Sequence, residues 1–509
     1  MSSDNQPALA PSLSPSTRSN VALVPPVSSS TLPALPNDTL PGPDAYLYGR
    51  KGPWPQPSPA HPQGESAAVI HLPDDEQAEW NKAIGDRYLK NLLTYWPTAL
   101  VYALENPHVE IMEDDEFGEL FRNSVMSRFL CPKLDPPDLA AFAPFLANPP
   151  PGSTFFKADF SAMGYVQPYE GMYIAPSVVL LRRDAKGTLT LVAIRVYDVV
   201  MSPVNVNAWP LAKCIALQGA TTRLILSFHP NLHFPYDAIN AVTKTALPKD
   251  HLVFKLLYPH TQYTLVLDNT VLTNEFSVLN NWRWLIYAPF AGTSTGLRNL
   301  VVAGHQGIPG NSAYPEFRFP VAGAEVEGPY GEFLRAYWNT FKGFVTTVLQ
   351  KLPPRDPLVA RWADHIAPWV KGFPDSRTIF EGDTLANVIT TYMHDVSVAH
   401  ACDHYDLGTY SINKLPLRLR VPPPASPDIP KQDPAKFMKK VDVFKYKMAA
   451  KMFFDPTNVT LLHEVDYNFT DPQLIQANNV FLQALRETEA NLKVKNFIPL
   501  NQIACSIQY

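Results

Sequence analysis

Several features that define common protein classes are missing from this sequence. The 509 residues contain only four cysteines, with no CxxC spacing among them: Cys131, Cys214, Cys402 and Cys505. This pattern disfavours a disulfide framework and a thiolate metal site, and we expect reduced intracellular thiols. No apolar run reaches roughly 18 residues, so we expect no transmembrane helix. The first residues contain no apolar secretory h-region, so the cytoplasm is the expected location.

Charge is also scarce. Only 17% of the residues are charged and the net charge is −5, which argues against a nucleic acid partner. Neither a GxSxG nucleophile motif nor a glycine-rich loop in a strand–turn–helix setting occurs, so a hydrolase elbow and a phosphate loop are not expected. The apolar share of 46% is instead sufficient for a substantial core.

Proline, by contrast, is abundant, and it is concentrated at the start of the chain. Residues 1–65 are rich in Pro, Ser, Ala and Asn and have no sustained hydrophobic periodicity. Such a segment cannot bury enough apolar surface to offset its ordering entropy, so we expect a disordered tail. The remainder, 66–509, is expected to form one domain.

Hydrophobic periodicity indicates that this domain is mainly α-helical. Helices are predicted near 75–95, 212–226, 333–348, 384–407 and 433–452, and from 471 onward, whereas 290–330 is rich in Gly and Pro and is predicted to be mostly loop. Two strands are predicted at 178–181 and 189–195, with a turn at 184–187 between them.

Two histidine pairs stand out, each inside an apolar segment. His229 and His233 are four positions apart, and so are His400 and His404. At that offset both side chains of a pair lie on one helix face, where two neutral imidazoles can hold one metal ion. Because burying four imidazoles is costly unless each finds a partner, a shared ion would satisfy all four. Imidazole without thiolate suits iron, manganese, zinc, copper or nickel.

Purely structural interpretations of the same kinds of residue remain open. A lone histidine on an apolar stripe is usually a core residue with satisfied nitrogens. His251 and His260 are not at the helical offset, and we expect them to support the ligands or the fold. His305 is expected in a loop without a role in the site. The lysine-rich helix near 436–451 is either a solvated polar face or a surface that rests transiently on an anionic membrane.

Three further motifs accompany the histidine pairs. Trp209, Ala212 and Lys213 form a W..AK pattern, HLVFKLLYPH occupies 251–260, and Ser397, His400 and His404 form an S..H...H pattern. In these motifs the sequence resembles the lipoxygenases, whose first metal helix contains W..AK and is followed by an HP..KLL.PH segment, and whose second metal helix contains S..H...N or S..H...H. The resemblance runs from roughly residue 110 to the end of the sequence. It implies a single large, mainly α-helical domain with a few short strands around a long central metal-binding helix.

The resemblance also implies a chemistry. A non-haem iron or manganese, held by His229, His233, His400 and His404, would take a hydrogen atom from a polyunsaturated fatty acid or another polyene, and dioxygen would trap the radical. Two alternatives remain open: an enzyme of this fold that acts on a non-lipid polyene or a hydroperoxide, and a metal-poor binding or scaffold protein. The family's N-terminal lipid-binding domain is not expected in this chain.

Three departures from the family pattern concern the metal site. Three residues separate His229 from His233, as in manganese-using fungal members, whereas most plant and animal members have four. Pro230 and Pro235 are expected to kink the helix. The family takes its last ligand from a C-terminal Ile or Val carboxylate, whereas this sequence reads NQIACSIQY from 501 to 509. Whether Cys505 to Tyr509 supplies a ligand is open, but we expect this segment to be buried against the His400 helix, with Ile507 nearer to the metal than Lys493.

Overall fold

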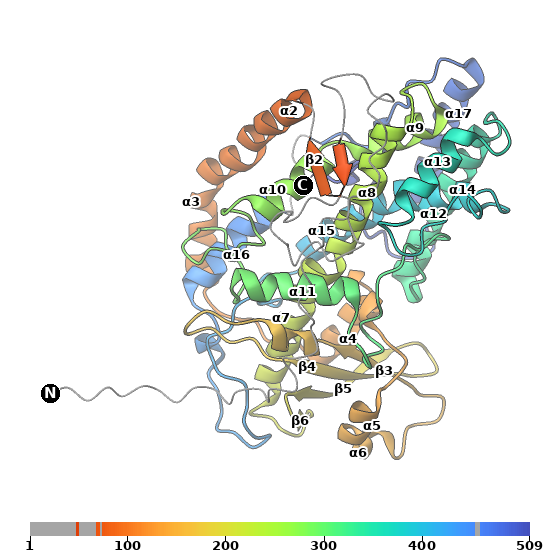
Figure 1. Ribbon diagram of the computed structural model, residues 1–509. Helices are drawn as coiled ribbons and strands as arrows, with labels where there is room; N and C mark the ends of the chain where they lie inside the picture. Colours follow the sequence, from red (N-terminus) through yellow and green to blue (C-terminus); the bar gives the residue numbers. More distant parts are fainter. Residues whose placement is uncertain (1–46, 50–67, 72–73, 454–458, 509) are drawn as a thin grey trace.

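The computed structural model describes residues 47–49, 68–71, 74–453 and 459–508, and helices dominate it (Figure 1). The α-helices are α2 (Asp74–Ile84), α3 (Lys90–Glu105), α4 (Asp114–Arg122), α5 (Pro136–Ala141), α6 (Ala143–Leu146), α7 (Trp209–Arg223), α8 (Pro230–Ala246), α9 (Leu252–Leu257), α10 (Thr264–Thr273), α11 (Ser294–Gln306), α12 (Gly328–Leu349), α13 (Pro357–Ile366), α14 (Thr384–His394), α15 (His400–Gly408), α16 (Lys440–Phe453) and α17 (Pro472–Ala490).

Shorter helical turns connect or extend these helices. Three of them are π-helical: η3 (Gly85–Leu89), η6 (Leu224–Phe228) and η8 (Asp395–Ala399). The others are 3₁₀ turns: η4 (Val125–Phe129), η5 (Ser161–Tyr165), η7 (Tyr258–Thr261), η9 (Pro434–Lys436), η10 (Leu462–Glu464) and η11 (Leu500–Gln502). Within the described residues, none of the helices combines the length and the apolar character that crossing a membrane requires.

Two long helical rods pass through the core. The first consists of α7, η6 and α8, and nearly every residue of it is buried. The second consists of α14, η8 and α15 and is buried to a similar extent. A helix that is surrounded by protein needs apolar or internally satisfied side chains on every face, and both segments have that composition. The predicted central metal helix is confirmed, as are the predicted helices at 212–226, 333–348 and 384–407.

A small antiparallel sheet packs below the first rod, at the bottom of Figure 1. Its strands lie in the order β3 (Thr154–Asp159), β4 (Ser177–Arg183), β5 (Leu189–Val196) and β6 (Val199–Met201). The predicted strands and their turn are confirmed: Asp184 Oδ1 accepts hydrogen bonds from the backbone N–H groups of Lys186 and Thr188, and Gly187 adopts the positive φ that this turn needs.

The region 290–330 is mostly loop, as predicted, but it also contains the thirteen-residue helix α11, which was not predicted. His305, expected in a loop, lies in the last turn of this helix. The basic helix begins at Lys440 and follows the separate turn η9, although we predicted a start at Asp433–Pro434. The glycines of α11 explain why this helix was missed, because they are packing residues: a Cβ at Gly304 would lie 2.5 Å from the Ser227 carbonyl oxygen.

Most of the segment predicted to be a disordered tail, 1–65, lies outside the described residues. Its only described part is β1 (Leu47–Gly49), which pairs antiparallel with β2 (Ala68–His71). The boundary near residue 66 therefore stays a prediction.

We expect Gly304→Ala to lower the free energy of unfolding by about 1–3 kcal/mol, because the added methyl group overlaps backbone atoms that cannot easily shift. Gly343→Ala is the matched control, since Gly343 also lies inside a helix but a Cβ there meets nothing within 4 Å. It should be neutral or stabilising by roughly 0.5–1 kcal/mol. Chemical denaturation measures both changes, and equal effects of the two substitutions would contradict the close packing of α11 on η6.

Candidate metal centre

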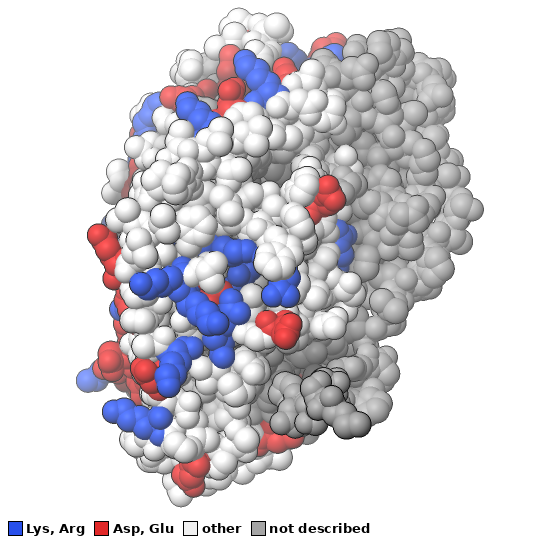
Figure 2. All heavy atoms as spheres, turned by 90° about the vertical axis from the view of Figure 1, so that its left-hand side faces the viewer, with Lys and Arg blue, Asp and Glu red and all other residues white. Residues whose placement is uncertain are grey.

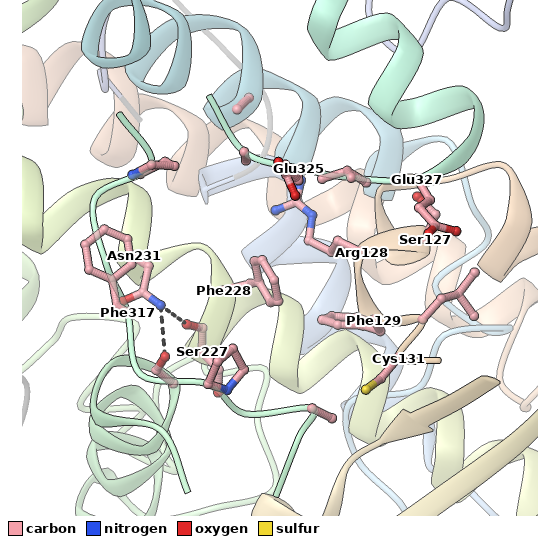
Figure 3. Close-up of a pocket in the computed structure, with 18 of the residues that line it drawn as sticks. Ser127, Arg128, Phe129, Cys131, Ser227, Phe228, Asn231, Phe317, Glu325 and Glu327 are labelled. Atoms are coloured by element: carbon pink, nitrogen blue, oxygen red, sulfur yellow. Dashed lines mark hydrogen bonds between the residues drawn. The ribbon is translucent and has the colours of Figure 1, made fainter. Parts of the chain in front are cut away.

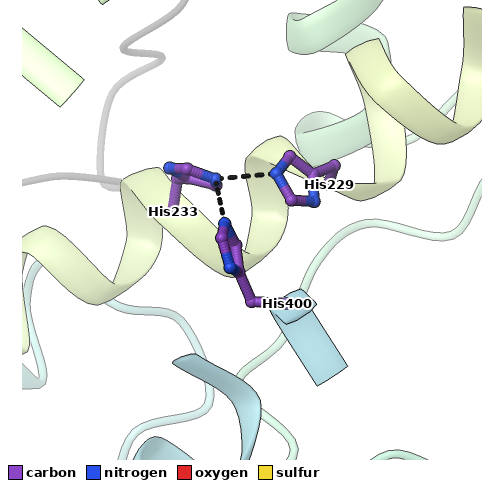
Figure 4. Close-up of side chains that lie close together, drawn as sticks. All are labelled: His229, His233 and His400. Carbon is purple, nitrogen blue, oxygen red and sulfur yellow. Dashed lines mark hydrogen bonds between the residues drawn. The ribbon is translucent and has the colours of Figure 1, made fainter. Parts of the chain in front are cut away.

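The four predicted histidines meet at one point between the two rods. His233 Nε2 lies 2.9 Å from His229 Nε2 and 3.1 Å from His400 Nε2 (Figure 4). His404 Nε2 lies 2.9 Å from His229 Nε2. Candidate ligand nitrogens of the first three all lie within 4.8 Å of one another, and His404 joins the group through its contact with His229. The pairs that the sequence placed on separate helices therefore form a single cluster.

A π-helical turn precedes the first histidine of each pair. η6 ends at Phe228 and η8 ends at Ala399, so His229 and His400 follow directly. The His229 N–H donates to the Leu224 carbonyl at 2.9 Å, an i→i−5 bond that widens the helix. Pro230 takes the first position of α8, where its missing N–H is tolerated. The wider turn thus accommodates Pro230 without ending the helix. α8 then continues through Pro235 to Ala246.

Buried carboxylates set the orientation of the first pair. His233 Nδ1 lies 2.7 Å from Asp268 Oδ1, and His229 Nδ1 lies 3.2 Å from Asp403 Oδ2. A carboxylate accepts the Nδ1 proton, which leaves an unprotonated Nε2 directed at the cluster centre. Carboxylates hold metal-binding histidines in proteins in the same way.

Burial favours the neutral form of these imidazoles. Desolvation lowers the pKa of His229, His400 and His404 well below its usual range, and the neighbouring histidines lower it further. Asp403 is buried too, and desolvation raises its pKa although Arg128 opposes the shift. The Arg128 guanidinium lies 2.6 Å from Asp403 Oδ1, so the charge of that carboxylate is balanced inside the protein. Neutral imidazole is the form that binds a metal.

The donor set fits a cation. With the Nδ1 protons of His229 and His233 directed at carboxylates, two nitrogen lone pairs face each other at 2.9 Å, a repulsive arrangement unless a positive charge lies between them. Imidazole nitrogen without thiolate suits iron, manganese or another transition metal and disfavours calcium and magnesium.

An apolar cavity of about 320 Å³ adjoins the cluster. His229, His233 and His404 form part of its wall. The other lining residues come mainly from α2, η3, α10, the segment that follows α10 and the end of α16, and they are largely aliphatic and aromatic. Among them Asp268 is the only charged side chain, and it is engaged by His233. The candidate centre therefore opens onto a space suited to an apolar ligand.

A larger and more polar cavity of about 1040 Å³ lies on the other side of the helix that carries His229 and His233 (Figure 3). Ser227, Phe228 and Asn231 line it, whereas His229 and Pro230, which lie between them in the sequence, line the apolar cavity. The Asn231 side-chain N–H group donates to the carbonyls of Ser227 at 3.3 Å and Gly304 at 3.0 Å, which ties the helix to α11. None of the four histidines lines this cavity, although Arg128, the ion-pair partner of Asp403, does.

The remaining predicted histidines have structural roles. His251 caps α9 by accepting from the Val253 N–H group at 3.2 Å. The Nδ1 atom of His260 lies 2.6 Å from the Cys505 carbonyl oxygen and its Nε2 atom 2.9 Å from the Tyr467 hydroxyl, and burial lowers the pKa of His260 to about 4. His305, expected in a loop, is instead half-buried in the last turn of α11, and desolvation lowers its pKa to about 3.

The segment 503–508 is buried, as predicted. Cys505 is hydrogen-bonded to His260 and Pro259, and Gln508 is hydrogen-bonded to Gln262, Arg87 and Thr460. From the C-terminal region, a polar contact with α15 comes from Lys495, whose Nζ lies 2.7 Å from Asp406 Oδ1. The packing of 503–508 against the His400 helix, the expected distance order of Ile507 and Lys493 from a metal, and any ligand from 505–509 stay predictions.

Three residues of the candidate centre were not predicted from the sequence: Asp268, Asp403 and Arg128. Asp403 could have been found, because it lies between His400 and His404 in the segment HACDH. The i, i+3 spacing places it close to the histidine face of the helix. Asp268 and Arg128 come from segments far away in the sequence, where no local pattern marks them.

Two buried helices that each present a histidine pair to one point beside an apolar cavity define a helical domain with a candidate metal centre. Its fold is that of the lipoxygenases. The structure superposes on the manganese lipoxygenase of Gaeumannomyces graminis with a TM-score of 0.66 and 14% sequence identity, over 91% of this chain and 96% of that one.

Curated proteins also match, although no family model does. A manganese lipoxygenase of Pleurotus sapidus is 27% identical over 41% of this chain, and a polyunsaturated fatty acid (12S)/(13S)-lipoxygenase, epidermal-type, of Rattus norvegicus is 22% identical over 67%. The matches span 34% and 56% of those proteins. The resemblance found in the sequence is confirmed at the level of a lipoxygenase-like domain.

We expect His400→Ala and His404→Ala to remove most of the bound metal, because each substitution leaves an incomplete set of ligands. Elemental mass spectrometry of the purified protein measures the metal. His108→Ala, at an exposed position, is the control and should retain it. Full occupancy in His400→Ala would contradict the cluster as the metal site.

Asp268→Asn should weaken metal binding by roughly 10–100-fold, because the carboxylate no longer holds the His233 tautomer that directs a lone pair at the centre. An amide N–H group presented to Nδ1 would favour the opposite tautomer. Competition with a chelator measures the affinity, and exposed Asp250→Asn is the matched control. Equal affinities of the two variants would rule out this orienting role.

Proposed function

We propose that this chain is a lipoxygenase-type dioxygenase that inserts dioxygen into a polyunsaturated fatty acid and thereby forms an oxylipin. The observation that carries the proposal is the convergence of four histidine nitrogens at the wall of an apolar cavity. The lipoxygenase fold and the named relatives support the same class of reaction. The oxygenase activity, the metal and the substrate are all parts of the proposal.

In this proposal His229, His233, His400 and His404 hold a non-haem iron or manganese. The bound metal supplies the one-electron chemistry that takes a hydrogen atom from a carbon between two double bonds. The chain's own part is to keep the imidazoles neutral by burial and to direct His229 and His233 through Asp403 and Asp268. The three-residue interval between His229 and His233 supports manganese as well as iron.

The cavity restricts what the substrate can be. A volume of about 320 Å³ lies at the low end of the roughly 300–1,000 Å³ of typical ligand pockets. No Lys or Arg is among the residues that line it, so a fatty acid carboxylate would have no cationic partner inside. We infer that the hydrocarbon chain enters the cavity and that the carboxylate stays at its mouth.

The absence of Lys and Arg from the described residues of the cavity wall also favours a second candidate substrate. An uncharged polyene would also fit a cavity without a cation, and the chemistry at the centre would be unchanged. Oxygen uptake by the metal-loaded protein distinguishes the two: linoleic acid and its methyl ester should both react if the carboxylate stays outside. Reaction with a neutral polyene but with neither of these would favour the second candidate. The absence of oxygen uptake with every polyene would contradict the dioxygenase.

Val271→Trp should lower kcat/KM for oxygen uptake at least tenfold without loss of bound metal. Val271 lines the cavity from α10, and the larger ring fills space that the substrate needs. Val480→Trp, at an exposed position on α17, is the control. Unchanged kinetics of the Val271 variant would show that this cavity does not hold the substrate.

A further inference from the structure

The outer face of α3 is apolar although it is exposed. No charged residue occurs between Lys90 and Glu105 in this helix. Its inner face, which includes the buried Ala99, packs against α16. At the outer face and in the turn before it lie six large apolar residues: Leu89, Leu93, Trp96, Leu100, Val101 and Leu104, which are 54, 73, 46, 41, 51 and 52% exposed. A surface helix of a water-soluble domain ordinarily has a polar outer face, so this stripe needs another explanation.

A second exposed apolar element lies in the segment 276–286. It contributes Phe276, Trp282, Trp284 and Ile286, which are 47, 49, 68 and 37% exposed. The next residue, Tyr287, belongs to the same small core cluster as Leu92 of α3 and Met452 of α16. The two exposed elements are therefore joined through one packed base, and together we call them the α3 face.

Positive charge accompanies the α3 face. Lys436 at the end of η9, Lys439, and Lys440 at the first position of α16 are exposed. Further along the same helix, the Nζ atoms of Lys447 and Lys451 lie 4.4 Å and 5.8 Å from the ring centres of Tyr102 and Tyr95 on α3. Figure 2 views the side on which α3 and α16 lie in Figure 1, and Lys and Arg gather near its middle amid broad uncharged areas.

The α3 face continues into the apolar cavity. Leu89 and Phe276 are about half exposed and also line the cavity beside His229 and His233. An apolar molecule could therefore pass from a layer that covers this face to the candidate centre without crossing water. Tryptophan beside leucine, together with lysine, is the combination that binds the interface of an anionic bilayer.

We propose that the α3 face docks onto an anionic lipid bilayer and receives the apolar ligand from it. A bilayer accounts for the exposed tryptophans, the lysines and the continuity with the cavity together. A protein partner would account for the first two only. Vesicle binding requires neither metal nor turnover, so this proposal can fail while the proposed oxygenase activity holds, and the reverse.

Flotation of the full chain with lipid vesicles tests the proposal. We expect binding to phosphatidylcholine vesicles that contain phosphatidylserine, at least tenfold weaker binding to pure phosphatidylcholine, and weaker binding at high salt. The triple substitution Leu93→Ser, Trp96→Ser and Leu100→Ser should reduce binding at least tenfold. Lys436→Gln, Lys439→Gln and Lys440→Gln together should remove most of the preference for phosphatidylserine.

The matched control is the pair Ile475→Ser and Val480→Ser. These residues are 44% and 54% exposed on α17, which lies on the opposite side of the molecule in Figure 1. The control should bind like the wild type, and thermal unfolding should show that all variants remain folded. Failure of the wild type to float, or equal binding by the triple variant and the control, would overturn the proposal. Concentration-dependent self-association that the triple variant abolishes, without vesicle binding, would identify a second copy as the occupant and would equally overturn it.

Discussion

The structure depends on four imidazoles buried at one point with their Nε2 atoms about 3 Å apart. Buried polar groups without partners are costly, and lone pairs that face each other repel. A shared cation would resolve both problems at once. It would also make each histidine pair depend on the other, because neither pair alone completes a coordination shell. The first and second rods meet at this point.

That requirement explains local features that would otherwise look like defects. The widened turns η6 and η8 directly precede the first histidine of each pair. The extra residue in each turn changes which side chains of the following helix point toward the centre. In the first rod the wider turn also admits Pro230, whose ring would clash inside a regular α-helix. Gly304 then allows α11 to pack directly on η6, which holds the widened turn in place.

The helix formed by η6 and α8 separates two different environments. One side carries the histidines and faces an apolar cavity, and the other side carries Asn231 and faces a larger polar one. The proposed bilayer contact fits this division, because the α3 face adjoins the apolar side. An apolar ligand would then meet hydrocarbon at every stage, while the charged pair Arg128 and Asp403 stays buried behind His229.

Much of this could be predicted from the sequence, because the relevant patterns are local. The i, i+4 spacing placed His229 with His233 and His400 with His404, and the apolar runs at 178–181 and 189–195, with a turn at 184–187 between them, indicated two strands. Helix α11 within 290–330 was not predicted because Gly296 and Gly304 reduce helix propensity, whereas both glycines permit close contacts with segments far away in the chain. The meeting of the two histidine pairs, the pairing of His233 with Asp268 and the shape of the cavity were decided only by the tertiary structure. Each of these brings together side chains from separate elements, and hydrophobic periodicity records which face of an element is buried but not what lies against it.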